Sequence, residues 1–269
     1  MIWRQAGREG RGKAIHTIAI AGKGGTGKTT LCGLLIDYLC KNGGSPVLAV
    51  DADPSSNLNE VLGVKAGITL GEIRDTVATA DQNPDSPIPA GLSKHEYMDY
   101  KFSAALAEED DFDLLVMGRT QGKGCYCFVN GLLQSQISKF AGRYKYVVVD
   151  NEAGMEHISR GLLPQVDTVL LVSDCSQRGV EAAIRIAELI GEVGVKPKAV
   201  KLIVNRAPEG GPAQGVLDKI AASGLDLAGV VAQDPAVYEY DSEGLPTATI
   251  PLDSPARVAV GEIAKKLFG

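Results

Sequence analysis

Short runs of apolar residues recur along this chain and alternate with stretches in which apolar residues repeat at helical spacing. Continuous apolar runs of this length, bounded by glycine, proline or polar residues, are typical of strands buried on both faces of a sheet. We expect strands at residues 17–21, 46–50, 114–117, 146–149, 168–173, 201–204 and 227–231.

Helical spacing is clearest directly after the first predicted strand, where the apolar positions are Leu31, Leu34, Leu35, Tyr38 and Leu39. Residues 179–193 and the amphipathic stretch 256–268 follow the same period. Strand–helix alternation with fully apolar strands predicts an α/β fold, a mostly parallel β-sheet with helices on both faces.

The chain of 269 residues is long enough to bury one substantial core, and α/β domains of this length often do not divide. We expect a single domain over residues 14–269. Residues 1–13 are rich in glycine and basic side chains and predict a flexible N-terminal tail. Residues 80–92 contain three prolines and predict an irregular insertion or lid.

Net charge and apolar content limit the classes of partner that this protein is expected to bind. A formal net charge of -6 and a pI near 5.2 argue against a surface that neutralises nucleic acid or anionic lipid, so we expect no nucleic acid partner and no stable membrane association. The chain has no run of about 18 apolar residues and no secretory leader, so a cytoplasmic location is expected. Five cysteines form an odd set, which favours reduced thiols.

A phosphate-binding motif follows the first predicted strand and precedes the first predicted helix. Residues 22–29 match G-x-x-x-x-G-K-[ST], in which backbone N–H groups and the helix N-terminus surround phosphate oxygens. Lys28 is expected to bridge the β- and γ-phosphates of ATP, and the Thr29 hydroxyl to bind Mg²⁺. The predicted ATP/ADP-binding residues of this loop are Gly22, Gly24, Gly25, Thr26, Gly27, Lys28, Thr29 and Thr30.

Lys23 adds a second lysine inside this loop. The pattern Lys-Gly-Gly-x-Gly-Lys-Thr resembles the deviant Walker A family, which includes nitrogenase iron protein and the ParA and MinD ATPases, and implies a P-loop NTPase of the SIMIBI/MinD type. In that family the extra lysine reaches the partner's nucleotide. The resemblance therefore implies an ATP-bound homodimer in which Lys23 acts in catalysis with Lys28.

Polar residues at later strand ends complete this predicted site, because the C-terminal ends of parallel strands face the nucleotide crevice. Asp51-Ala52-Asp53-Pro54 resembles the family's switch I, which implies that Asp53 positions the attacking water and Asp51 lies close to the Mg²⁺ shell. Asp150 occupies the Walker B position, and the following residues resemble switch II, with Gly154 turned toward the γ-phosphate. Asn205 matches the adenine-binding position, and residues 233–234 are further candidates.

Cys125 and Cys127 form a C-x-C pair in a polar, glycine-rich stretch after an apolar strand. One intervening residue lets both sulfurs face one side, which suits a shared metal better than a disulfide. The pair supplies two ligands of a tetrahedral site, and a two-fold axis could supply two more. Cys32, Cys40 and Cys175 are expected to be structural thiols.

Several stretches together resemble the CooC-type ATPases that mature nickel enzymes. They are residues 22–30, 51–54, 117–130 and 150–157, and the third contains the sequence MGR…GCYCFVN. The resemblance implies that Cys125 and Cys127 bind Ni²⁺ or Zn²⁺ across a dimer and that the client is carbon monoxide dehydrogenase or acetyl-CoA synthase. Thiolate ligands do not decide between the two ions.

Two other functions remain open from the residues alone. One is an ATP-driven electron-transfer reductase similar to nitrogenase iron protein, with an iron–sulfur cluster between subunits. The other is an ATPase that positions DNA or membrane, which the acidic charge disfavours.

Overall fold

The computed structural model describes residues 15–80, 88–89, 91–119, 135, 143–152, 166–192 and 195–269. The predicted tail, most of the predicted insertion, Cys125, Cys127 and Gly154 lie outside these residues. The strands are β1 (His16–Gly22), β2 (Val47–Asp51), β3 (Ala107–Glu108), β4 (Phe112–Val116), β5 (Tyr146–Asp150), β6 (Thr168–Asp174), β7 (Ala199–Ala207) and β8 (Asp226–Ala232). The α-helices are α1 (Lys28–Leu39), α2 (Leu58–Leu62), α3 (Leu70–Thr79), α4 (Lys94–Ala105), α7 (Gln177–Glu192), α8 (Gln214–Ser223), α9 (Pro235–Ser242) and α10 (Pro255–Phe268).

Within the described residues the strands form one sheet of eight, in the order β3-β4-β2-β5-β1-β6-β7-β8. All neighbours run parallel except β3, which pairs antiparallel with β4. The expected α/β fold with a mostly parallel sheet is confirmed.

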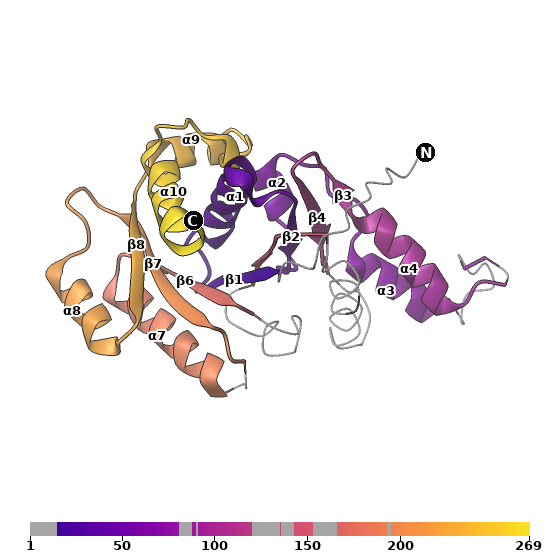
Figure 1. Ribbon diagram of the computed structural model, residues 1–269, viewed down its shortest axis with the longest axis horizontal. Coiled ribbons are helices and arrows are strands. Elements are labelled where there is room, and N and C mark those ends of the chain that lie inside the picture. The colour runs from indigo at the N-terminus through magenta and orange to yellow at the C-terminus, as the bar shows by residue number, and fades with distance from the viewer. Residues whose placement is uncertain are drawn as a thin grey trace.

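Helices cover both faces of the sheet, as Figure 1 shows. One buried cluster joins the sheet to α3, α4, α7 and α8, and the other joins it to α1, α2 and α10. Strand β1 serves both clusters, because Ala19 and Ala21 point to the first and Ile18 and Ile20 to the second. This two-sided burial explains why the central strands are continuously apolar.

The strand order places β1 at the centre, between β5 and β6, with β2 next to β5. The C-terminal ends of these parallel strands therefore lie along one edge, where the loops after β1, β2, β5 and β7 can meet. Among the described helices, none combines the length and apolar character needed to cross a bilayer.

Candidate nucleotide site

The loop between β1 and α1 is shaped by glycines that leave no room for a side chain. A Cβ on Gly22 would lie closer than 3.0 Å to the Val172 carbonyl oxygen, and one on Gly27 would collide with the Asn205 amide. Gly25 and Gly27 also adopt positive φ, 77° and 88°, a region that L-residues with side chains rarely enter. The backbone can therefore curl directly into the N-terminus of α1, where positive partial charge favours phosphate.

Side chains hold this loop by binding its carbonyl groups. Asn205 Nδ2 donates to Thr26 O at 2.8 Å, and Arg206 Nη1 donates to Gly25 O at 3.0 Å. The Thr26 hydroxyl and Lys28 Nζ both donate to Lys23 O, at 2.9 and 3.2 Å. The loop is thus preorganised by residues from β7 as well as by its own side chains.

The two loop lysines differ in environment. Lys28 is only 7% exposed, and burial lowers its pKa, while Asp150 and Asp53 oppose that shift. Its ammonium group therefore sits among carboxylates, ready to bind phosphate oxygens. Lys23 is exposed, as a residue must be if it is to reach another molecule.

Asp51 and Asp150 end the adjacent strands β2 and β5 in the same register. Their exposed fractions are 0% and 1%. Burial raises the pKa of Asp51 to about 6 and that of Asp150 to about 7. Burial and mutual repulsion disfavour the ionised forms of these two neighbouring carboxyls. A cation bound beside them would relieve that repulsion, so the pair favours cation binding.

The carboxyl of Asp150 fits a magnesium site. The nearby Thr29 side chain partly offsets the rise in its pKa that burial causes, and its Oδ1 is buried without a hydrogen-bond partner. Mg²⁺ prefers such hard oxygen ligands and keeps several waters. No cluster of three or more His, Cys, Asp or Glu side chains suited to a metal occurs in the described part of the chain, so phosphate and water would supply the other ligands.

Asp51 has a different task, because its carboxyl oxygens accept hydrogen bonds from the backbone of the following loop. Oδ1 accepts from Asp53 N at 3.1 Å, and Oδ2 accepts from Leu58 N at 3.0 Å. Asp53 in turn accepts from Ser55 N at 2.8 Å and lines the cavity. Asp51 therefore orders residues 53–58 and places Asp53 beside Lys28.

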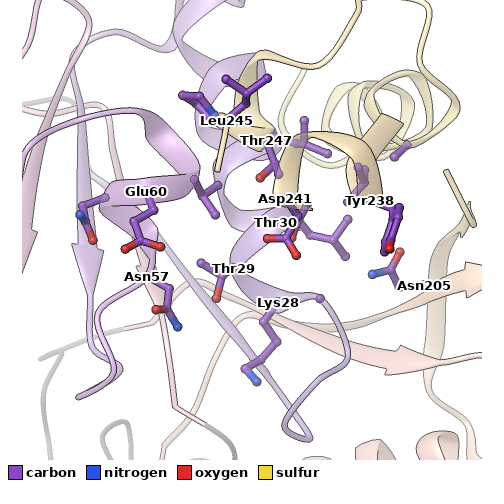
Figure 2. A pocket seen from close by; sticks show the side chains of 18 of the residues that line it. Lys28, Thr29, Thr30, Asn57, Glu60, Asn205, Tyr238, Asp241, Leu245 and Thr247 are labelled. Carbon is purple, nitrogen blue, oxygen red and sulfur yellow. The ribbon is translucent and has the colours of Figure 1, made fainter. Parts of the chain in front are cut away.

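A cavity of about 1610 Å³ opens in front of the loop and α1. Figure 2 shows α2 on one side of it and α9 on the other, with Lys28, Thr29 and Thr30 rising along α1 between them. Asn205, Tyr238 and Asp241, all labelled in Figure 2, also line this cavity. The phosphate loop thus continues into a hollow large enough for a complete nucleotide.

Tyr238 and Asp241 were not predicted from the sequence. They lie one helical turn apart on α9, and Tyr238 is 77% exposed although it lines the cavity. No local sequence pattern marks them, because they reach the cavity through the packing of α9.

Asp234 lines the cavity and also has a structural role, while the predicted nucleotide contact stays a prediction. One carboxylate oxygen accepts from Ala236 N and the other accepts from Ala256 N and the Ser254 hydroxyl. It therefore caps α9 and ties it to the start of α10. Gln233 lines the cavity.

The cysteines within the described residues, Cys32, Cys40 and Cys175, are free thiols. Cys32 is fully buried, and burial raises its pKa well above the usual value. This is the environment of an inert, structural thiol. The predicted metal pair and Gly154 cannot be placed, because they lie outside the described residues.

Comparison with known proteins agrees with this architecture. Residues 17–247 match the family model described as the CobQ/CobB/MinD/ParA nucleotide binding domain. An ATP-binding protein of Methanocaldococcus jannaschii is 41% identical over 93% of this chain and 98% of its own. The carbon monoxide dehydrogenase accessory protein CooC of Rhodospirillum rubrum is 30% identical over 85% of this chain and 88% of its own.

Solved structures share the fold at lower identity. The septum site-determining protein MinD of Pyrococcus horikoshii, complexed with Mg-ADP, is 22% identical with a TM-score of 0.68 and covers 94% of this chain and 96% of that one. A ParA family ATPase of Chlorobium tepidum is 19% identical with a TM-score of 0.71, and the match covers 94% of this chain and 98% of that one. This chain belongs to the CobQ/CobB/MinD/ParA nucleotide-binding family.

Proposed function

We propose that this protein hydrolyses ATP and uses the nucleotide cycle to bind and deliver a metal ion to a nickel enzyme. The observation that carries the ATPase part is the grouping of Lys28, Asp53 and Asp150 around one preorganised loop. Family membership supports the same activity. The metal part rests on the Cys125–Cys127 pair and on the relationship to CooC.

The geometry of Asn205 favours adenine over guanine. Its Nδ2 donates to Thr26 O and its Oδ1 accepts from Arg206 N at 2.9 Å, which fixes the orientation of the amide. Nδ2 keeps one free N–H and Oδ1 keeps one free lone pair. The amide can therefore accept a hydrogen bond from the N6 amino group of adenine and donate one to adenine N7. Guanine would direct its O6 acceptor at the Oδ1 acceptor, which is repulsive. We therefore assign ATP and ADP as the nucleotides.

Hydrolysis would proceed by attack of water on the γ-phosphate. Asp53 would accept a hydrogen bond from the attacking water and orient it, while Lys28 and backbone N–H groups of residues 24–28 stabilise the charge on the phosphate oxygens. Mg²⁺ held by Thr29, with Asp150 behind it, would supply further charge neutralisation. Gly154 would add an N–H donor to the γ-phosphate.

The active form proposed is a homodimer. Exposed Lys23 would cross to the partner's nucleotide, so ATP favours the closed state over the open one. The cysteine pairs of the two copies would together give four thiolates, a suitable set for Ni²⁺ or Zn²⁺. Closure would then change metal affinity, and by linkage metal would change nucleotide affinity by the same factor.

The test compares Ni²⁺ binding by the wild type and by Cys125→Ala/Cys127→Ala, using equilibrium dialysis with Mg·AMP-PNP present. We expect about one Ni²⁺ per two chains for the wild type and none for the double variant, with nucleotide binding intact. Cys40→Ala/Cys175→Ala removes the same number of thiols and should bind metal like the wild type.

The outcome that contradicts the assignment is undiminished Ni²⁺ binding by Cys125→Ala/Cys127→Ala. Protein purified without oxygen should also be analysed for iron. Stoichiometric iron with broad visible absorbance would instead indicate the reductase function.

A further inference from the structure

Helix α9 presents a carboxylate to the cavity as well as the ring of Tyr238. Tyr238 and Asp241 both line the cavity, whereas Glu239 of the same helix does not. Residues three positions apart lie on the same side of an α-helix. One side of α9 therefore offers an aromatic ring and a carboxylate to whatever the cavity holds.

The Asp241 carboxylate is available for a ligand. The backbone carbonyl of Asp241 accepts from Gly244 N at 3.2 Å, but its carboxylate takes part in no hydrogen bond or ion pair within the described residues. By contrast, both carboxylate oxygens of Asp234, at the start of α9, accept hydrogen bonds from the protein. An ionised carboxylate only accepts hydrogen bonds, so Asp241 suits a ligand that carries hydroxyl or amino donors.

Helix α9 begins beside the strand end that carries Asn205. Ala207 pairs with Ala232 in the register of β7 and β8, and Gln233 N donates to Ala207 O at 2.8 Å. The helix starts two residues later, at Pro235. The first turn of α9 is therefore held next to the end of β7, on the side of the cavity where Asn205 would bind adenine.

The chain after α9 returns to α1. The 3₁₀ turn Thr247–Thr249 packs on that helix, and a Cβ on Gly33 would meet the Ala248 Cβ at 3.5 Å. Gly33 lies about one turn beyond Thr30 in α1. Helix α9 therefore runs along the cavity wall from the Asn205 side toward α1, with Asp241 in its last turn (Figure 2).

Ribose joins the base of a nucleotide to its α-phosphate. A nucleotide with adenine at Asn205 and phosphates at the N-terminus of α1 must therefore place its ribose along α9. We propose that Asp241 accepts hydrogen bonds from the ribose hydroxyls and makes the site specific for ribonucleotides. An acidic side chain has this task in other nucleotide-binding α/β folds, and its charge strengthens the bond. The inference rests on the proposed function, which supplies the positions of base and phosphates.

The other carboxylates that line the cavity are less suited to the ribose. Asp53 and Glu152 lie near the buried loop lysine, at the phosphate end. Asp234 has hydrogen-bond partners for both oxygens. Glu60 belongs to α2, across the cavity from α9 (Figure 2). The carboxylate in the last turn of α9 is therefore the one expected at the ribose.

The test compares ADP with 2′,3′-dideoxy-ADP, which differ only in the ribose hydroxyls, by titration calorimetry with Mg²⁺. For the wild type we expect ADP to bind at least about tenfold more tightly, because the dideoxy sugar leaves the carboxylate without a donor. For Asp241→Ala we expect the two affinities to agree within about twofold. Glu239→Ala removes the same charge from the same helix outside the cavity lining and should keep the wild-type ratio.

The ratio separates recognition of ribose from other effects, because a change in charge or in stability would alter both affinities equally. Asp241→Asn keeps the shape of the side chain and a weaker acceptor. Its ratio should lie between those of the wild type and Asp241→Ala, and it replaces Asp241→Ala if that variant does not fold.

A wild-type ratio near one, or a wild-type ratio kept by folded Asp241→Ala, would overturn the inference and leave nucleotide binding intact. Loss of discrimination in Glu60→Gln but not in Asp241→Ala would place the ribose against α2 and also overturn it. Failure of the wild type to bind ADP at all would instead overturn the proposed ATPase function.

Discussion

Asp51 and Asp150 face each other in register at the ends of β2 and β5, two strands whose backbones lie about 4.8 Å apart. Both carboxyls are buried, yet only Asp51 has partners for both oxygens. One aspartate therefore shapes the loop that carries Asp53, while the other keeps an oxygen available for a cation or its water.

Nucleotide affinity should depend on pH between about 5 and 8, since burial raises the pKa of Asp51 to about 6 and of Asp150 to about 7. Raised carboxyl pKa values mean that the ligand-free folded state holds extra protons, so its stability falls as pH rises from about 4 to 7. A bound cation requires the ionised form. Mg·AMP-PNP should therefore bind more weakly at pH 6 than at pH 8, measured by calorimetry.

Asp150→Asn is the comparison for this pH effect, because it removes one titrating carboxyl and keeps the shape. Its Mg·AMP-PNP affinity should be lower and less sensitive to pH. A wild-type affinity that is constant from pH 6 to 8 would contradict the proposed magnesium site.

Asp53→Asn should bind ATP normally but hydrolyse it about 10² to 10⁴ times more slowly, because the neutral amide accepts a weaker hydrogen bond from the attacking water than the carboxylate does. The asparagine side chain retains an oxygen for Ser55 N, so the loop geometry is preserved. Single-turnover phosphate release measures the effect. A variant with wild-type turnover would exclude Asp53 as the residue that orients the attacking water.

Tyr238→Ala should weaken ATP binding by about tenfold or more, as expected when an aromatic ring that stacks on a base is removed. Tyr238→Phe keeps the ring and should behave like the wild type. Fluorescent nucleotide titration tests both. Equal affinities for all three proteins would place the base elsewhere in the cavity.

Asp234→Ala should destabilise the fold by about 2 kcal/mol, since it removes the cap of α9 and the anchor of α10. Urea unfolding followed by circular dichroism measures this loss. ATP affinity of the folded variant should change by less than about threefold, because the carboxylate is committed to the helices. A large loss of affinity without a loss of stability would restore Asp234 as a nucleotide ligand.

The central strands were predictable because they are apolar on both faces, and β1 and β5 to β8 begin within two residues of the expected positions. Helices α3 and α4 were missed, although Thr69-x-x-Glu72 and Ser93-x-x-Glu96 form capping boxes that mark helix starts. Strand β3 has only two residues and depends on its pairing with β4, which no local pattern reveals.

The phosphate side of the site was predictable because its chemistry lies in one contiguous motif, Gly22 to Thr30. The side of the cavity lined by Tyr238 and Asp241 was not predictable, because these residues reach it through the packing of α9 against the 3₁₀ turn Thr247–Thr249. Asp234 shows that a polar residue after a strand can also serve the fold, since its carboxylate caps α9 and binds the start of α10.

The central proposal is a dimer of this chain that is held together by nucleotide and shares one metal ion. Native mass spectrometry of the full chain with Mg·AMP-PNP and Ni²⁺ tests this most directly. We predict a dimer carrying two nucleotides and one Ni²⁺, which Lys23→Ala converts to nucleotide-bound monomer. A wild-type protein that binds nucleotide but stays monomeric with both ligands present would contradict it.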